Sequence, residues 1–493
     1  MKKITYFVAA ALLAMSYSCS EDFLGAQPTG QLTDAQLEDV SQTRPEIIAG
    51  TLSGVYVQTL TTGTGGTTGH DDFGQKGYDI MSDFLSGDLA LSVSTYGWYR
   101  GLTELQNTTD FTVGDNRQVW RYYYRIIKSS NTVIAALGGG DAVPDLDTNK
   151  HILGQAKTLR AYAYFYLTQF YSDKYEPAKA ILPIYTEPTQ LNQPKSTTTE
   201  VFNLIVKDLE DSISLLETFT RSAKNEINKS IAQGLLAYTY GYMGEAENLA
   251  KAKTLTSDII NNGGFQLMSS TEVRGGFNNI NTPGWMWGFD ITTDLGLDLI
   301  SWWGQMDLFT YSYQWAGDKK AIDAGLFAQI PSNDIRKGQF LNSPSSSNHL
   351  IPYNKFYDPA RSIGGQRNIT TDYVYMRVAE MYLLNAEMSA KTGDEATAKT
   401  SLKALVSQRV PDASYIDALS GKQLLDEIYL QTRIELFAEG KSYLALKRNR
   451  ATVVRGTNHL SNVGTPISYD DNRLTFEIPQ DEIQNNPFIS EQN

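Results

Sequence analysis

Aromatic side chains gather in one short stretch of the sequence. Residues 301–315 read SWWGQMDLFTYSYQW, and six of these fifteen residues are aromatic. Small and polar residues stand between the rings, whereas a buried strand favours Val and Ile and a buried helix favours Leu and Ala. An aromatic ring can stack on the flat C–H face of a sugar, while Asp, Gln or Arg bonds to its polar rim. The pattern favours a wet, ring-lined binding surface.

A second ring-rich segment precedes this stretch. WMWGFD occupies residues 285–290 and alternates rings with Met and Gly. On a β-strand, where successive side chains point to opposite faces, Trp285, Trp287 and Phe289 would share one face. Five of the seven tryptophans lie between Trp285 and Trp315. Any single ring could equally cover a helical core, so both interpretations stay open for individual residues.

Motifs for catalysis are incomplete. The four histidines show no metal-ligand spacing, and neither HExxH nor GxSxG occurs. EGKS at Glu439–Ser442 resembles the end of a P-loop, but Glu435 stands where its first glycine belongs. Carboxylate pairs are common in any acidic chain, so a surface glycosidase stays open as a third interpretation. We expect a protein that is not an enzyme.

One acidic segment resembles the start of a calcium loop. DLDTNK covers residues 145–150, but Lys150 replaces the required glycine and Ala156 replaces the twelfth-position ligand of an EF-hand. An EF-hand is therefore excluded, and a looser structural calcium site stays open. We expect no other cofactor or metal.

Composition describes a globular, acidic chain. The 493 residues are 41% hydrophobic and 20% charged, with a formal net charge of −13 and a pI near 4.9. Nucleic-acid binding needs a basic patch that displaces counterions, and the sequence contains no run of Lys and Arg that could form one. The 29 tyrosines suit a polar binding surface as well as a core.

The N-terminus resembles a bacterial lipoprotein signal. MKK precedes an apolar run of twelve residues from Ile4 to Met15, and the only cysteine, Cys19, follows shortly afterwards. A membrane span needs about 20 apolar residues, so this run predicts a signal peptide over residues 1–18 and an acylated Cys19. Ser16, Tyr17 and Ser18 depart from the usual leucine-led cleavage box, and an ordinary secretory signal is the alternative. No later apolar stretch is long enough to span a membrane.

Helical periodicity predicts a scaffold that carries an irregular face. Apolar residues recur at helical spacing in residues 32–60, 119–262 and 373–450, where paired helices meet at glycine-containing turns. Such pairs resemble tetratricopeptide repeats and must stack to bury their apolar stripes. Residues 61–118 and 264–372 lack this period, and we expect a loop-rich, aromatic ligand face there with few short strands. Charged residues on the helices, such as Arg160, Arg377 and Arg433, are expected to be solvated or paired locally.

Six motifs in order resemble the SusD/RagB family of outer-membrane nutrient-binding lipoproteins. They are SCSEDFLGAQPTG (residues 18–30), AKTLRAYAYFYLTQFY (156–171), VFNLIVKDLEDSISLL (201–216), the block from MRVAEMYLL to SQRV (376–410), ELFAEGKSYLALKRN (435–449) and FEIPQDEIQNNP (476–487). Lys441 and Ala445 depart from the Arg and Asp that the family uses there. The resemblance implies a mostly α fold, with residues 19–493 forming a single SusD-like body.

The resemblance also implies a function and a ligand site. A SusD-like protein would be anchored by lipid in the outer membrane, facing the cell exterior, and would deliver an oligosaccharide to a SusC-like TonB-dependent transporter without cleaving it. An oligopeptide ligand is the alternative, since some relatives take peptides. The family's ligand lies near an early loop and a later aromatic-rich loop, which match residues 70–100 and 285–315. The candidate ligand-binding residues are Asp83, Trp98, Tyr99, Arg100, Trp285, Trp287, Trp302, Trp303, Gln305, Asp307, Tyr311, Tyr313 and Trp315.

Overall fold

The structure, a computed structural model, describes residues 45–493. The predicted signal peptide and Cys19 lie outside the described residues. Within residues 45–493, no helix is both long enough and apolar enough to cross a bilayer.

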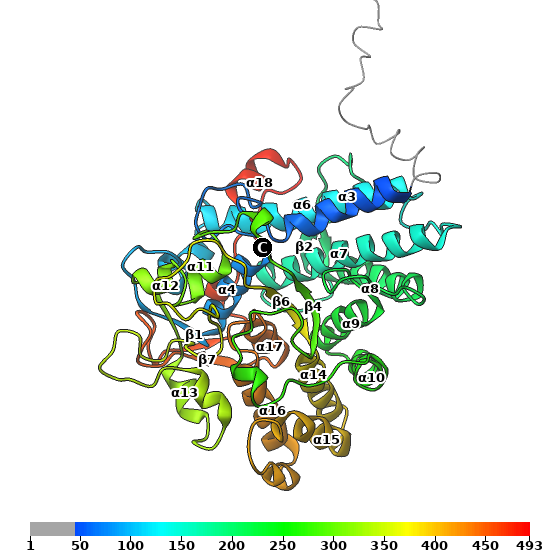
Figure 1. Ribbon diagram of the computed structural model, residues 1–493. Coiled ribbons are helices and arrows are strands. Elements are labelled where there is room, and N and C mark those ends of the chain that lie inside the picture. Colours follow the sequence, from blue (N-terminus) through cyan, green and yellow to red (C-terminus); the bar gives the residue numbers. More distant parts are fainter. Residues whose placement is uncertain (1–44) are drawn as a thin grey trace, which may run out of the picture.

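A series of packed helices forms the scaffold of the protein (Figure 1). Each helix contacts the next in the order α6, α7, α8, α9, α10, α14 and α15, while α3 packs on α6 and α7 and α16 packs on α14. The fold is therefore mostly α, built from stacked helix pairs, as the periodicity predicts. The scaffold helices are α3 (Pro45–Gln58), α6 (Gly114–Ala136), α7 (Asp147–Tyr171), α8 (Thr198–Leu215), α9 (Lys229–Met243), α10 (Ala246–Asn262), α14 (Val378–Lys391), α15 (Glu395–Val406), α16 (Gly421–Glu435) and α17 (Ser442–Arg448).

Local sequence signals start and stop these helices. Helix α8 begins with a capping box in which Thr197 and Glu200 bond to each other's backbone N–H groups. Helix α9 ends at Gly244, whose φ of 77° lies in the left-handed region that a residue without Cβ adopts without strain. Asp394 caps α15 by accepting a hydrogen bond from the N–H of Thr397. These signals fix where each pair turns.

Helix α7 lies at the centre of the scaffold. Every residue from Ile152 to Tyr171 is buried, because α6 and α8 pack on its two sides. Close approach to α8 needs Gly154, since a Cβ there would lie 2.8 Å from Leu216. A helix that is enclosed on all sides loses the clear amphipathic pattern of a surface helix.

Four antiparallel two-stranded ribbons join distant parts of the chain. Ribbon β1–β5 pairs Leu89 with Ile322, and ribbon β4–β6 pairs Trp285 with Arg377. The other two ribbons are β2–β3 and β7–β8. The strands are β1 (Leu89–Val93), β2 (Ala180–Pro183), β3 (Lys195–Thr197), β4 (Trp285–Phe289), β5 (Lys319–Ile322), β6 (Tyr373–Arg377), β7 (Thr452–Val454) and β8 (Pro466–Ser468). The sequence analysis expects few short strands, and WMWGFD does form one of them.

Residues 61–118 are more regular than the sequence pattern indicates. Helix α4 (Gln75–Ser86) is buried along its whole length. Its buried polar residues are paired inside the protein: Lys76 forms an ion pair with Asp79 at 2.9 Å. Short helices account for much of the remaining irregular chain. They are α5 (Arg100–Thr103), α11 (Trp302–Met306), α12 (Tyr313–Ala316), α13 (Ala324–Gln329) and α18 (Gln480–Asn485), with 3₁₀ turns at Asn107–Thr109, Glu272–Arg274, Thr293–Leu295, Ile335–Gln339, Ser414–Ala418 and Asn472–Leu474.

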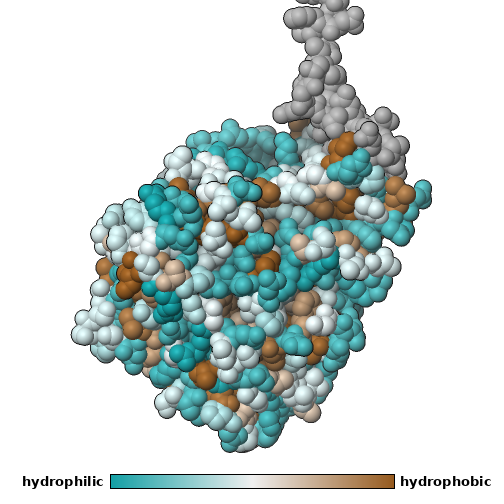
Figure 2. Space-filling model, in the orientation of Figure 1, coloured by the Kyte–Doolittle hydropathy of each residue, from teal (hydrophilic) through white to brown (hydrophobic). Residues whose placement is uncertain are grey.

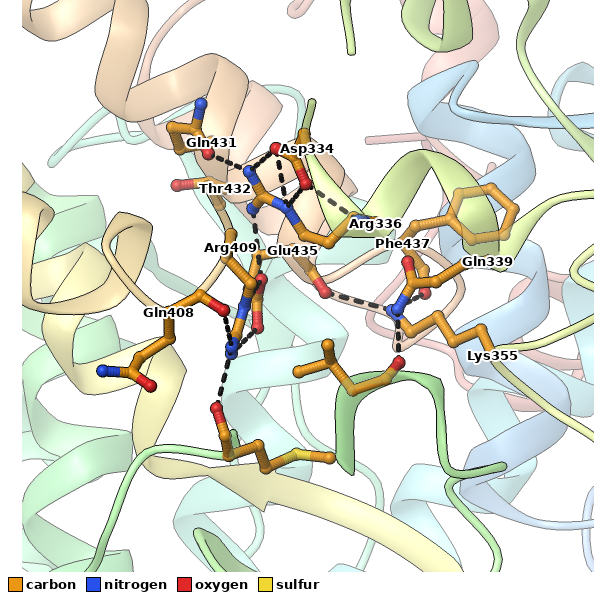
Figure 3. Close-up of polar contacts among 12 residues, drawn as sticks. Asp334, Arg336, Gln339, Lys355, Gln408, Arg409, Gln431, Thr432, Glu435 and Phe437 are labelled. Carbon is orange, nitrogen blue, oxygen red and sulfur yellow. Dashed lines mark hydrogen bonds and ion pairs between the residues drawn. The ribbon is translucent and has the colours of Figure 1, made fainter. Parts of the chain in front are cut away.

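A buried ionic network ties the irregular face to the scaffold. Figure 3 shows Arg336, in the 3₁₀ turn Ile335–Gln339, and Arg409 converging on Glu435 at the end of α16. The Glu435 carboxylate lies 3.1 Å from Arg336, 2.9 Å from Arg409 and 2.7 Å from Arg377. Burial alone would raise the pKa of Glu435, but Arg409 and Arg377 hold it well below its usual value. This carboxylate is therefore ionised and multiply paired.

Pairing of the helix charges is long-range rather than local. Arg377 pairs with Glu435 and Glu439 instead of forming an exposed pair with Glu380, which accepts the backbone N–H of Arg377. Arg433 likewise pairs with Asp88 near β1. The expectation of solvated or local pairs is wrong at these positions, because tertiary packing brings each arginine to a buried carboxylate from a distant segment, although the Arg433 side chain stays 22% exposed.

Candidate functional site

The β1–β5 ribbon brings the two candidate ligand segments together. The chain that leaves β1 carries Trp98, and the chain that enters β5 carries Trp315. Asp318, fully buried just before β5, accepts backbone hydrogen bonds from Thr95 at 2.7 Å, Tyr96 at 2.8 Å and Trp98 at 3.2 Å. One carboxylate therefore fixes the loop that presents the first set of rings.

Four rings from three segments contact one another at this point. The imidazole of His70 stacks on the Trp98 indole with centroids 5.0 Å apart and planes within 3°. Tyr313 packs edge-on against His70, Trp98 and Tyr96, with centroid distances of 5.7, 5.9 and 5.5 Å. The Tyr313 hydroxyl also lies 2.6 Å from Nδ1 of His70. These contacts hold the rings rigidly before any ligand arrives.

A second ring pair adjoins the first through α12. Ser312 caps this helix by accepting a hydrogen bond from the N–H of Trp315. The rings of Tyr311 and Trp315 are 5.6 Å apart, and the Arg367 guanidinium lies over Tyr311 at 4.7 Å. Arg367 pairs with Asp298 at 2.9 Å, and both side chains are largely exposed. Polar groups suited to hydroxyl or amide recognition therefore stand beside the rings.

We call the set His70, Tyr96, Trp98, Tyr311, Tyr313 and Trp315 the aromatic surface. Tyr96 is 59% exposed and Trp315 is 41% exposed, while His70, Trp98 and Tyr311 are partly exposed and Tyr313 lies beneath them. Exposed tryptophan and tyrosine are unusual, since such large rings are normally buried. The face shown in Figure 2 is mostly hydrophilic, with scattered hydrophobic residues.

Charge at the aromatic surface is set by burial. The pKa of His70 is lowered by desolvation, so the imidazole is neutral at neutral pH and keeps one acceptor nitrogen. Beneath it, burial and the nearby Asp115 raise the pKa of Asp71 to about 7. Neither group places a full fixed charge beside the rings at neutral pH, which suits an uncharged ligand.

Four of the predicted ligand-binding tryptophans are buried. Trp285, Trp287, Trp302 and Trp303 are each at most 2% exposed. Trp287 packs on Tyr375 and donates its indole N–H to the carbonyl of Asn225, while Trp302 packs edge-on against Phe356 at 4.6 Å. Because scaffold and loop residues enclose them, these rings support the core. The predicted contact with a ligand is corrected for all four.

Four further predicted residues are also buried. Asp83 accepts a hydrogen bond from the N–H of Gly440, and Tyr99 packs on Phe84. Asp307 accepts the N–H groups of Phe309 and Asp358. Gln305 donates to the carbonyl of His70 at 2.7 Å and so supports the aromatic surface from below. The prediction that these four side chains contact a ligand is corrected, because each is at most 3% exposed.

The remaining predicted residues lie at or near the surface. Trp98, Tyr311, Tyr313 and Trp315 belong to the aromatic surface. Arg100 is exposed and pairs with Glu104 at 2.8 Å. The sequence analysis does not single out His70, Tyr96 or Arg367. His70 and Tyr96 lie inside the predicted segment 70–100, so a search for every ring within that segment would have found them.

Metal-binding side chains do not cluster in the described residues: within 45–493 no group of three or more His, Cys, Asp or Glu could hold an ion. In the segment that resembles a calcium loop, Asp147 begins α7 and pairs with Lys150 at 2.8 Å.

Comparison with protein families identifies the chain. A SusD-like family model described as "Starch-binding associating with outer membrane" matches residues 79–240, and the SusD family model matches residues 337–493. The first match spans most of α4 through most of α9, and the second spans α14 to α18. This protein belongs to the SusD/RagB family. No curated protein sequence matches the chain.

Solved structures share the fold along almost the whole chain. A SusD-like carbohydrate-binding protein from Bacteroides vulgatus is 24% identical, with a TM-score of 0.75 over 90% of this chain and 97% of that one. A SusD superfamily protein from Bacteroides thetaiotaomicron is 23% identical, with a TM-score of 0.74 over 91% of this chain and 99% of that one. Surface glycan-binding protein A from B. thetaiotaomicron, solved in complex with laminarihexaose, is 17% identical, with a TM-score of 0.66 over 91% of this chain and 99% of that one. The predicted fold class is confirmed.

Proposed function

We propose that this protein is a surface glycan-binding lipoprotein that captures an oligosaccharide on its aromatic surface. The observation that carries the proposal is the rigid, partly exposed cluster of rings around Trp98 and Trp315, with polar side chains beside it. Indole and phenol rings present flat apolar faces of the size of a pyranose, and stacking removes both from water. Family membership and a similarly folded glycan-binding protein support the same ligand class.

The protein would act by binding and delivery. We propose that an acylated Cys19 anchors it in the outer membrane, facing the cell exterior, and that it passes its ligand to a SusC-like TonB-dependent transporter. Bond cleavage plays no part in this proposal, and the neutral His70 serves as a ring and an acceptor. Incubation with polysaccharide should produce no new reducing ends.

Calorimetric titration against a panel of oligosaccharides of different linkages tests the ligand class. At least one neutral oligosaccharide should bind. The double variant Trp98→Ala with Trp315→Ala should lose about 2 kcal/mol or more of binding free energy, as loss of aromatic anchors does. Phe488→Ala is the matched control, since Phe488 is 60% exposed and lies outside the aromatic surface. It should bind like the wild type.

A peptide digest forms the second arm of the same titration. Binding of peptides but of no glycan would overturn the glycan proposal in favour of an oligopeptide carrier. Glycan binding that is unchanged after loss of both tryptophans would support the ligand class but would refute the aromatic surface as the binding site.

A further inference from the structure

A separate cavity opens among the scaffold helices. Its volume is about 630 Å³, and it lies where α9 turns into α10, beside the ends of α14 and α17. Figure 1 shows α12, which carries part of the aromatic surface, on the other side of the molecule from α9 and α10. We call this cavity the cationic pocket. Its lining residues used here are Lys174, Glu176, Tyr242, Lys391, Lys447, Arg448 and Arg450.

Positive charge dominates its wall. Five of the lining side chains are Lys or Arg, and Glu176 is the one acidic residue among them. Behind the wall, Glu387 pairs with Arg448 at 2.7 Å and with Lys391 at 2.6 Å. Lys174 lies 3.3 Å from Glu176 and 3.5 Å from Asp470. Three carboxylates thus face five cations, and the nearby Asp173 pairs with Lys179 at 3.0 Å, so two of the five cations are left without an ion pair.

Lys447 is one of the two cations without a carboxylate partner. It is 2% exposed, and its ammonium donates to the backbone carbonyls of Gln169 and Ser172. Among the described residues it has no ion pair within 4.0 Å. An ammonium has three N–H donors, so the two carbonyls leave one donor without an oxygen partner; the ammonium also lies over the Tyr443 ring, 4.8 Å from its centroid. Desolvation lowers the pKa of Lys447 to about 7, and a bound anion would favour its charged form.

Arg450 is the other unpaired cation. Its side chain is exposed and, within the described part of the chain, makes no ion pair or hydrogen bond, although it lines the same cavity. The hydroxyl of Tyr242, on the same wall and 9% exposed by residue, also has no hydrogen-bond partner among the described residues. Two cations without ion pairs therefore line one polar cavity, with the unpartnered Tyr242 hydroxyl buried in its wall.

From this arrangement we infer that the cationic pocket binds an oxyanion, namely a carboxylate, sulfate or phosphate group. Two uncompensated cations and an unpartnered hydroxyl supply several donors, and an arginine can bond such a group in two places. The whole chain carries a net charge of −13, so long-range attraction does not concentrate anions near it. Binding would depend on these local donors. The inference is independent of the proposed glycan site.

Titration calorimetry on the full chain in detergent at low ionic strength tests the inference. The probes are inorganic sulfate, inorganic phosphate and glucuronate, with glucose as the uncharged counterpart of glucuronate. We expect at least one anion to bind with a single site, and glucose not to bind in this pocket. The variant Lys391→Gln with Arg450→Asn should weaken the anion at least ten-fold. Asn suits position 450, where φ is 49°.

Matched controls separate this site from general charge effects. Lys422→Gln removes a positive charge from an exposed pair with Asp426 on α16 and should leave anion affinity unchanged. Trp98→Ala with Trp315→Ala should also leave it unchanged, even though glycan binding is lost. Arg450 is exposed and Lys391 is 20% exposed, with Glu387 still paired to Arg448 after the substitution, and circular dichroism will verify the fold.

The three probes distinguish the source of the anion. Binding of sulfate or phosphate alone would support a site for a free inorganic ion, and binding of glucuronate but not glucose would support a site for an acidic sugar. Absence of binding by all three anions would overturn the inference. An equal loss of affinity in Lys422→Gln would overturn it as well.

Discussion

Asp83 is a carboxyl group buried inside α4 with little to stabilise its charge. One of its oxygens accepts the N–H of Gly440, and the other has no partner in the described residues. Desolvation raises its pKa well above the usual value, and Asp79 and Asp88 raise it further. The protonated form is therefore favoured in the folded protein.

Asp83→Asn should make the protein progressively more stable than the wild type as pH rises. The pKa of Asp83 in the folded state lies above its value near 3.8 in the unfolded chain, so wild-type stability is lost as pH rises from about 4 toward the folded pKa. The loss amounts to at most about 1.4 kcal/mol per pH unit. Urea unfolding at pH 5 and pH 8 measures it. A stability difference that is constant between the two pH values would contradict the assigned protonation state.

At the scale of secondary-structure elements, the conformation of the loop between β1 and α5 depends on Asp318. The three backbone N–H groups that this carboxylate accepts belong to the residues that precede and carry the Trp98 ring. Gly317, with φ of 132°, lets the two chains approach, because a Cβ there would lie 2.4 Å from the Thr95 hydroxyl. Asp318, which directly precedes β5, therefore fixes the position of Trp98.

Asp318→Ala should weaken oligosaccharide binding about ten-fold while leaving the scaffold folded. Loss of the carboxylate releases the 95–98 loop, so the Trp98 ring must be ordered when the ligand binds. Calorimetry measures the affinity, and hydrogen exchange should show faster exchange of the Tyr96 and Trp98 amides. Unchanged exchange of these two amides would mean that other contacts hold the loop. Asp298→Ala, which removes a partly exposed pair with Arg367 and a hydrogen bond from the N–H of Leu299, serves as a comparison for stability.

Sequence periodicity predicts most of the scaffold, but α4 lies in the segment predicted to be loop-rich. Helices such as α8 and α15 bury one apolar stripe between neighbouring helices, so their period survives in the sequence. Helix α4 buries Lys76, Asp79 and Asp83 together with its apolar residues; Lys76 and Asp79 pair within the helix, whereas Asp83 accepts a hydrogen bond from Gly440 of a distant segment. The local sequence does not show which buried polar residues will find partners in the folded protein.

The exposure of the aromatic side chains in residues 301–315 cannot be predicted from the local sequence either. Trp302 and Trp315 belong to one aromatic stretch, yet Phe356 and Lys76 cover Trp302 while Trp315 remains exposed. Composition predicts that this stretch contributes to a binding surface. Which ring faces solvent depends on segments that arrive from elsewhere in the chain, and a single sequence does not show them.

At the scale of the whole molecule, Glu435→Gln should destabilise the protein by about 3–5 kcal/mol, because removing one partner leaves buried guanidinium groups uncompensated. Since its pKa is depressed, the contribution of Glu435 to stability is present above its unfolded pKa near 4.5 and is lost as pH falls. Urea unfolding at pH 7 measures the loss. Asp426→Asn on the same helix is the control, because its pair with Lys422 is exposed and should contribute little. Equal effects of the two substitutions would contradict a structural role for the network.

Membrane attachment tests the proposed anchor. Cys19→Ala should release the protein from the membrane fraction, because acyl chains would supply attachment at about 0.8 kcal/mol per buried CH₂ group. Fractionation of cells followed by immunoblotting compares the variant with the wild type. A variant that stays in the membrane pellet would argue against the lipoprotein proposal, and co-purification of a TonB-dependent transporter with the wild type would support the proposed partner.

The ribbon that joins Leu89 to Ile322 also constrains the order in which the protein can acquire its function. Its two strands are separated in the sequence by the five scaffold helices α6 to α10, so closing this contact costs loop entropy that local helices do not have to overcome. The N-terminal half can form local helices, but it has no β5 and no Asp318 against which to arrange Trp98. The aromatic surface can therefore be assembled only once nearly two thirds of the chain is available, and a fragment that ends before β5 would lack it.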